Sequence, residues 1–210
     1  MPADPPLAVP GPVPPGPPRS ALALGAALGA GAWWCDQVFT VAGGWVPTTP
    51  EAAVRVHLAE LSRVVGDHGV ALRRHLPRPT GTDPEAWVVP PSAAAEEAVV
   101  ALAGLEGTAT RLTGLHRGLV PRLLVLWGAH RRDPAPADRG VARTLGHAHH
   151  DLAALWHDGE ALLQAALDTD PALGAVLAGA VTAVEGPIAR GGGLVGPPPA
   201  APPGADPTTA

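Results

Sequence analysis

The chain has 210 residues, of which 46% are hydrophobic and 16% are charged, and its formal net charge is −5. This length allows one domain with a substantial core, whereas the negative charge and the lack of a basic run exclude nucleic acid as an expected partner, because phosphate binding needs clustered Lys or Arg. The single cysteine, Cys35, excludes an internal disulfide and is compatible with a reducing cytoplasm.

Both ends of the chain are rich in proline and glycine. Residues 1–18 and 191–210 cannot build a core, so we expect two disordered tails around one helical domain at residues 19–190. The longest apolar run, Ala21 to Cys35, is shorter than the roughly 20 residues of a membrane span. Because prolines and Asp4 replace the short basic start of a signal peptide, we expect a cytoplasmic protein without membrane contact, with secretion as the open alternative.

The first two predicted helices follow the N-terminal tail. One spans about Ser20 to Ala42, carries Phe39 on its apolar side and is expected to stop at Gly43-Gly44. The next begins at Thr49-Pro50-Glu51, where Thr49 is the predicted N-cap and the proline occupies the first helical position. It is expected to end at Leu76, before a proline.

The remaining helices are predicted from caps and from the helical period of apolar residues. Ser92 is the expected cap of a short helix that ends at residue 103, and a longer helix follows at about 108–130, with a kink at Pro121. Asp138 is the expected cap of a helix that ends near residue 168, and Asp170-Pro171 starts the last one. Since no strand pattern is present, we predict an all-α fold: an up-and-down four-helix bundle with a short crossover helix and an extra C-terminal helix.

Four of the nine histidines lie in one predicted helix, within the segment RTLGHAHHDLAALWHDGEALLQ. Clustered imidazoles and carboxylates are what a metal site needs. On a helical projection, however, His147, His150 and His157 lie opposite the apolar side that contains Leu152. We therefore interpret these three histidines as part of a solvated face.

Other histidines are predicted to point inward. His68 lies close to the apolar face of the helix at 49–76, with His57 and His75 on the same flank, while His116 and His130 lie within the apolar face of the helix at 108–130. Each is either a structural histidine with a hydrogen-bond partner or a ligand. The candidate metal ligands are His68, His116, Asp36, Asp151 and His149. No cofactor is predicted; if these residues bind a metal, it is zinc or iron.

Sequence motifs of known enzymes are missing. A di-iron bundle requires Glu-x-x-His motifs, whereas only the reverse spacing occurs, from His57 to Glu60 and from His157 to Glu160. There is neither a Gly-x-Ser-x-Gly elbow nor a phosphate-binding loop. The pattern therefore favours a protein that is not an enzyme.

Several segments resemble a group of uncharacterised helical proteins of GC-rich bacteria that have a ferritin-like bundle. They are GAWWCDQVFTVAGGWVPTTPEAAVRVHLAELSRVVGDH, AWVVPP, LVPRLLVLW and RTLGHAHHDLAALWHDGEALLQ, and they cover about Trp33 to Leu167. The resemblance implies a ferritin-like bundle, with iron or oxygen chemistry at inward Glu and His residues, for which His68 and Asp151 match. Because inward carboxylates are few, a bundle without this reaction is favoured.

Two functions are compatible with these observations. The first is a non-catalytic binding or assembly protein of unassigned ligand, whose partner is a second copy of the chain or another protein. The alternative is a ferritin-like metal-binding protein or metalloenzyme with a histidine-rich site inside the bundle.

Overall fold

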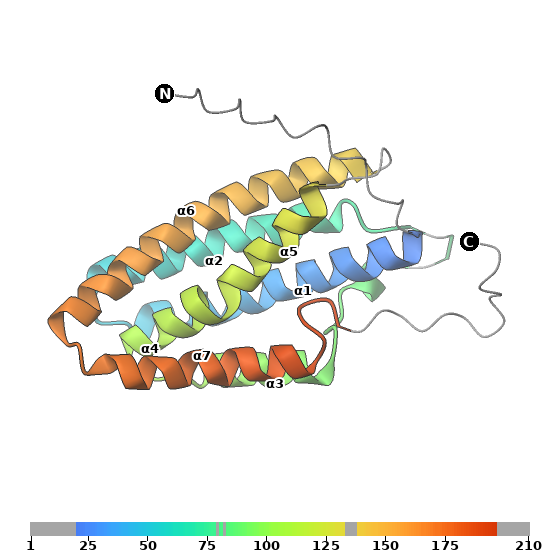
Figure 1. Ribbon diagram of the computed structural model, residues 1–210. Coiled ribbons are helices and arrows are strands. Elements are labelled where there is room, and N and C mark those ends of the chain that lie inside the picture. The colour runs from blue at the N-terminus through green and yellow to red at the C-terminus, as the bar shows by residue number, and fades with distance from the viewer. Residues whose placement is uncertain (1–19, 79, 82, 133–137, 197–210) are drawn as a thin grey trace, which may run out of the picture.

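All regular structure in the described part of the chain is helical, as Figure 1 shows for the computed structural model. The structure describes residues 20–78, 80–81, 83–132 and 138–196. The predicted all-α class is therefore confirmed. The predicted tails at 1–18 and 197–210 lie outside the described residues. Residues 191–196, expected in the second tail, instead fold back onto α1 (Ala21–Trp45): Leu194 is buried, and its carbonyl accepts a hydrogen bond of 2.9 Å from Trp34 Nε1.

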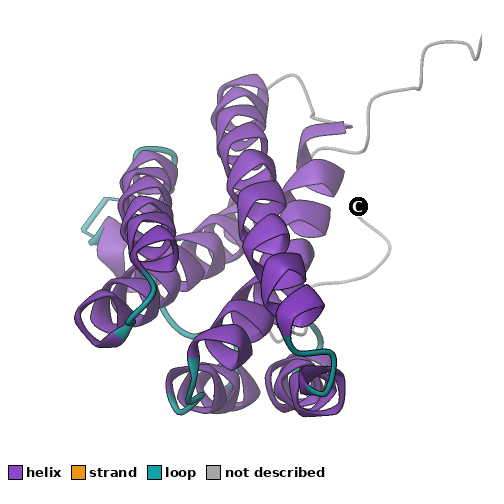
Figure 2. Cartoon of the chain, turned by 90° about the vertical axis from the view of Figure 1, so that its left-hand side faces the viewer, coloured by secondary structure: helices purple, strands orange, loops and turns teal. Residues whose placement is uncertain are grey.

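Four of the five long helices pack against one another in turn, and the fifth packs against the shorter elements. The bounds of the long helices are α2 (Ala52–Arg73), α5 (Val120–Arg132), α6 (Arg139–Thr169) and α7 (Leu173–Arg190), in addition to α1. The shorter elements are η1 (Val46–Thr48), η2 (Pro84–Trp87), α3 (Ala93–Ala103), α4 (Thr108–Thr113) and the π-helical turn η3 (Gly114–Leu119). Contacts run from α1 to α2, from α2 to α6 and from α6 to α5, while α3 pairs with α7, which also covers η3 and α4. Figure 2 shows this arrangement along the helix axes.

The boundary between α1 and α2 differs from the prediction. Helix α1 continues through Gly43 to Trp45. A Cβ at Gly43 would lie only 2.9 Å from the Ser62 hydroxyl oxygen, so this glycine permits close packing of α1 on α2. Thr49 does not cap α2: its hydroxyl donates to the carbonyl of Trp45 at 2.9 Å, and the N-cap position belongs to Glu51. Helix α2 ends at residue 73, three residues earlier than expected.

The other predicted helix starts are confirmed to different degrees. The hydroxyl of Ser92 accepts the N–H of Ala95 at 3.1 Å, as an N-cap does. Asp138 is at the N-cap of α6 but makes no capping hydrogen bond. The carboxylate of Asp170 accepts the N–H of Ala172 at 3.1 Å, just before α7 begins at Leu173.

The helix expected at 108–130 is interrupted by η3, directly before Pro121. Proline has no N–H and its ring crowds the carbonyl four residues earlier, so the preceding turn cannot keep α-helical hydrogen bonds. Instead, the N–H of Val120 bonds to the carbonyl of Leu115, five residues back, as in a π-helix. The expected kink is thus realised as a wider turn.

Phe39, which was predicted on an apolar face, is 51% exposed and lies over Gly66 of α2. Val176 of α7 is also exposed, at 58%. By length and composition, α7 is apolar enough to cross a membrane, with a mean hydropathy of 1.2. One such helix is weak evidence, because helices of soluble proteins share these properties, and α7 packs against α3 and η3.

Candidate functional site

Two histidines on one side of α2 and a third just after its end contact the neighbouring helices. We call His57 and His68 of α2, together with His75 two residues beyond it, the α2 histidine row. Each has a polar partner across a helix interface: His57 Nε2 lies 2.9 Å from His116 Nε2, His68 Nε2 lies 3.1 Å from Asp151 Oδ2, and His75 Nε2 lies 2.7 Å from Thr144 Oγ1. The flank that the sequence indicated is therefore a polar seam between α2, η3 and α6.

Helix α6 presents matching polar residues at regular spacing. Thr144, Asp151 and Asp158 recur every seven residues, which is close to two helical turns, so they share one side of α6. Since His75 meets the first of them and His68 the second, α2 and α6 run antiparallel.

An open groove of about 840 Å³ lies between α2 and α6, above this seam. Its walls are largely apolar, and its charged groups are four carboxylates and one guanidinium. The charged and histidine residues that line it are His57, Glu60, Arg63, Asp67, His68, Asp151 and Asp158. A volume of this size is within the range of small-molecule sites.

His116 is held firmly at the contact with His57. Its side chain is completely buried in η3. Its backbone carbonyl accepts a hydrogen bond of 2.6 Å from Trp156 Nε1. Gly159 of α6 faces the ring, where any Cβ would overlap it. The position of this imidazole is therefore fixed by backbone on one side and by packing on the other.

The paired histidines are neutral at pH 7. Burial lowers the pKa of His116 to about 3, and the neighbouring His57 acts in the same direction. Burial also lowers the pKa of His57, against the attraction of Asp158 and Glu60. Within the described residues, Nδ1 of His116 has no hydrogen-bond partner. A buried polar atom without a hydrogen-bond partner lowers the free energy of unfolding by about 1–3 kcal/mol, and such atoms are rare in native structures.

A second polar contact lies farther along the same groove. Burial lowers the pKa of His68, whereas Asp151 raises it. The 3.1 Å contact between these side chains becomes an ion pair when the imidazole is protonated, but it lacks the alignment of a hydrogen bond. This partner keeps His68 oriented across the interface between α2 and α6.

The carboxylates of the two His-x-x-Glu pairs are used elsewhere. Glu160 accepts a hydrogen bond of 3.0 Å from Arg117 Nε and another of 2.7 Å from Gln164, and the arginine lowers the pKa of this carboxyl. Glu60 pairs with Arg63 at 3.4 Å on the surface of α2. Neither glutamate contacts the histidine three residues before it in this arrangement.

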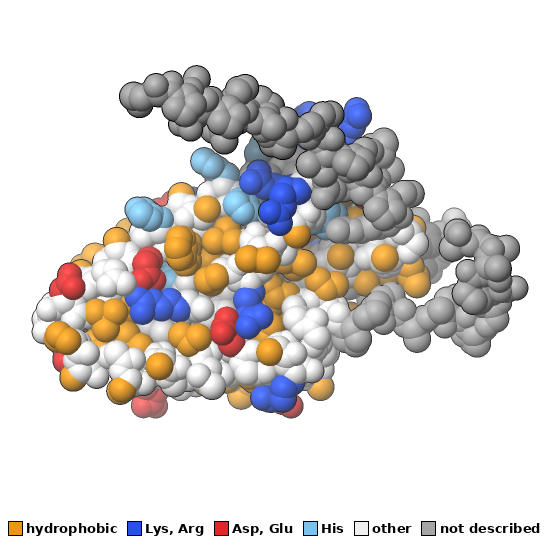
Figure 3. Space-filling view, viewed as in Figure 1, with side chains coloured by type: hydrophobic (Ala, Val, Ile, Leu, Met, Phe, Trp, Pro, Cys, Tyr) orange, Lys and Arg blue, Asp and Glu red, His pale blue; other side chains and the backbone are white. Residues whose placement is uncertain are grey.

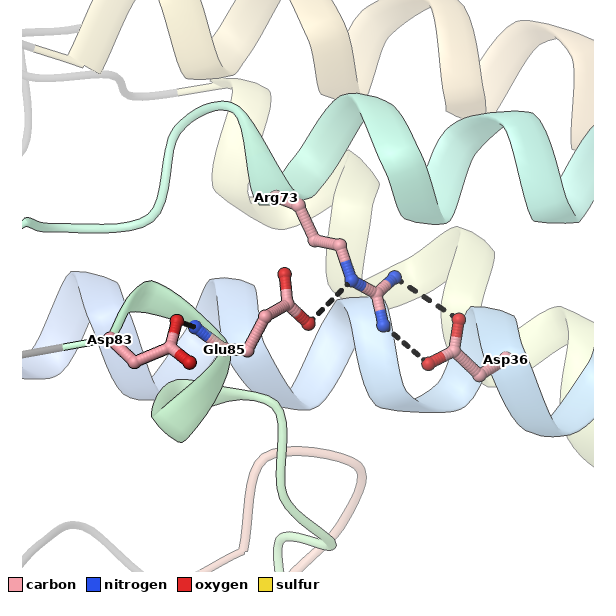
Figure 4. A network of polar contacts seen from close by, with 4 residues as sticks. All are labelled: Asp36, Arg73, Asp83 and Glu85. Carbon is pink, nitrogen blue, oxygen red and sulfur yellow. Dashed lines mark hydrogen bonds and ion pairs between the residues drawn. The ribbon is translucent and has the colours of Figure 1, made fainter.

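The five predicted metal ligands are distributed over four places. His68 and Asp151 lie together, whereas His116 is paired with His57. Asp36 instead accepts two hydrogen bonds from Arg73, at 2.5 and 3.1 Å, and Glu85 shares the same guanidinium (Figure 4).

His149, the fifth of these residues, faces Gly128 of α5. Burial lowers the pKa of His149, and so do Arg131 and His150. Across the described ranges, no three His, Cys, Asp or Glu side chains are gathered as a metal-binding group.

The solvated face of α6 agrees with the prediction. His147, His150 and His157 are exposed, and Figure 3 shows histidine side chains along the upper edge of the molecule, where α6 runs. His57 was not predicted as a member of the site, because its helical position placed it only on the flank of α2. Two features of the sequence could have indicated its role: its alignment with His68 on one side of the helix, and the seven-residue spacing of Thr144, Asp151 and Asp158 on α6.

The groove thus offers apolar walls, the imidazoles of His57 and His68, and four carboxylates. Neutral imidazoles donate lone pairs, while carboxylates attract cations, so the groove favours positively charged ligands over anions. Searches against family models, curated proteins and solved structures found no match to this chain.

Proposed function

We propose that the protein is a non-catalytic binding protein built on a ferritin-like four-helix bundle, and that the α2–α6 groove holds a small amphipathic cation such as an organic amine. The observation that carries this proposal is the composition of the groove: apolar walls flanked by four carboxylates and one guanidinium. That guanidinium, on Arg63, is already paired with Glu60 and Asp67. Among the described arginines, none pairs with Asp151 or Asp158, so their negative charge is left for a ligand.

The order of helix contacts supports the bundle architecture. Helices α1, α2, α6 and α5 contact each other in sequence around the main core, and α2 and α6 are antiparallel. Helix α3 then corresponds to the crossover helix, while α7 is the extra C-terminal helix. Cofactor and ligand sites of such bundles lie between facing helices, as this groove does.

Isothermal titration calorimetry with matched amines and carboxylates tests the proposal. Hexylamine and benzylamine are expected to bind, whereas hexanoate and benzoate are not, because the rim repels anions. Asp158→Asn is expected to weaken amine binding about two- to fivefold, the effect of one exposed charge contact. Equal binding of amines and carboxylates would contradict the proposal.

Filling the groove provides the second arm of this experiment. Ala161 lines the groove and is exposed, so Ala161→Trp is expected to abolish amine binding without disturbing the core. Ala183 of α7 is also exposed but lies outside the groove, so Ala183→Trp is the matched control and is expected to bind amines normally. Unchanged binding in the Ala161 variant would show that the amine occupies another place.

A further inference from the structure

The contact between His57 and His116 has the spacing of two ligands on one metal ion. Their Nε2 atoms lie 2.9 Å apart. Zinc binds imidazole nitrogen at about 2.0–2.1 Å, so two such nitrogens lie about 2.9 Å apart at a right angle and about 3.4 Å apart in a tetrahedral site. The observed separation matches two ligands at a right angle, and a tetrahedral site requires the two nitrogens to move apart by about 0.5 Å and the rings to turn toward the cation.

We infer that His57 and His116 form a mononuclear site for a borderline divalent cation such as zinc, cobalt or nickel, completed by the carboxylate of Glu60 or Asp158. This inference goes beyond the proposed amine binding, because it concerns a different ligand, held between His57, which lines the groove, and the buried His116, and it does not require an amine.

The surroundings of His116 favour a ligand function over a purely structural one. The ring is completely buried, its Nδ1 has no partner among the described residues, and it lies in a π-helical turn. Such turns are rare and often mark functional sites. Trp156 and Gly159 fix the position of the ring in advance, as a metal ligand requires.

Proton positions remain balanced when the cation binds. Without metal, one Nε2 carries the hydrogen that the other accepts. With metal, both Nε2 atoms coordinate as neutral bases, and the displaced hydrogen is carried by Nδ1 of the same ring. Binding at the histidine pair therefore needs a change of tautomer and no net loss of a proton.

Two carboxylates are candidates to complete the site through a change of side-chain conformation, because no third ligand is gathered with the histidine pair among the described residues. Glu60 follows His57 by three residues, so the two side chains are neighbours on α2. Asp158 approaches from α6, and the charges of both carboxylates act on His57. The pair of Glu60 with Arg63 is exposed and 3.4 Å long, and such a pair is exchanged at little cost. Two nitrogens and one carboxylate oxygen suit zinc better than magnesium or calcium.

Titration of the full chain with cobalt and zinc tests the site. The protein, made without an affinity tag and stripped with chelator, is expected to bind one Co²⁺ per chain with visible d–d absorption, and Zn²⁺ is expected to displace it. His57→Gln and His116→Gln are each expected to weaken binding at least 100-fold. His68→Gln is the matched control from the same histidine row, and its affinity is expected to stay within about twofold of the wild type.

Exposed histidines supply the control for adventitious binding. A variant in which His147, His150 and His157 are all changed to Gln is expected to keep the stoichiometric metal. Loss of the metal in this variant, or wild-type affinity in His57→Gln, would overturn the inference. Among Glu60→Gln and Asp158→Asn, one is expected to lose at least tenfold in affinity, and if neither does, the carboxylate part of the inference is wrong.

A measurement on the wild type covers the case in which the histidine variants fail to fold. In long-range ¹H–¹⁵N spectra, zinc is expected to shift the imidazole signals of His57 and His116 and to leave those of His68 unchanged. Shifts confined to exposed histidines would overturn the site. If the protein binds zinc but no amine, the metal site is supported and the proposed function is contradicted. If it binds amines but no zinc, the proposed function is supported and the metal site is contradicted.

Discussion

At the scale of single residues, Gly159 decides where the His116 ring lies. Any Cβ at this position would overlap the imidazole, which is completely buried and has no room to withdraw. We expect Gly159→Ala to lower the free energy of unfolding by up to about 2 kcal/mol, because an overpacking cost of about 1–3 kcal/mol outweighs the roughly 1 kcal/mol that alanine gains as a helix former. Urea unfolding followed by circular dichroism measures this change.

Gly146 gives the matched control on the same helix. Nothing lies within 4 Å of a Cβ built there, so Gly146→Ala is expected to raise the free energy of unfolding by about 0.5–1 kcal/mol. Stabilisation by both substitutions would show that the ring of His116 is free to move away from α6.

At the scale of elements, Arg73 joins three of them. Its guanidinium on α2 bonds to Asp36 of α1 and to Glu85 of η2, and these carboxylates raise its pKa (Figure 4). We expect Arg73→Ala to destabilise the protein by about 1–2 kcal/mol, since it removes charged hydrogen bonds between elements that are distant in sequence. The thermal melting temperature reports this loss.

Arg63 is the comparison for this prediction, because its two ion pairs lie on the exposed surface of α2 alone. With side chains more than half exposed, these pairs are expected to contribute less than about 0.5 kcal/mol. If Arg63→Ala and Arg73→Ala shift the melting temperature equally, the connection between α1, α2 and η2 does not stabilise the fold.

Local patterns predicted the helices well, and their failures have tertiary causes. Ser92 caps α3 as expected because capping involves only neighbouring residues. Thr49 does not cap α2, because its hydroxyl donates a hydrogen bond to the carbonyl of Trp45 instead. The polar partner of His57 depended on how η3 and α2 are aligned, and the helical period of one segment contains no information on that alignment.

At the scale of the whole molecule, the buried histidines make stability depend on pH. Burial lowers the pKa of His57, His68 and His116 in the folded protein, and that of His116 to about 3. In the unfolded chain these groups titrate near 6.5. The unfolded state therefore binds more protons below pH 6.5, so stability is complete above that pH and falls as the pH decreases toward the folded pKa values.

Urea unfolding between pH 7.5 and 5 measures this dependence. Each histidine that stays neutral in the folded state contributes up to about 1.4 kcal/mol per pH unit below 6.5. His116→Gln is expected to reduce the slope by about one proton, whereas a variant with the three exposed histidines changed to Gln is expected to keep it. An unchanged slope in His116→Gln would mean that this ring is protonated in the folded state.

The π-helical turn η3 also has an evolutionary consequence. Such a turn holds one residue more than the α-helical turn it replaces, so a single deletion within residues 114–119 would shorten the turn before Pro121 and preserve the faces on either side. A deletion between this turn and Leu123 would rotate the following residues by about 100° and misplace Leu123 and Trp127, both buried. Chains that descend from this one and have lost a residue within the turn would keep these apolar faces, so helix length alone would separate them from those that retain the π-helical turn.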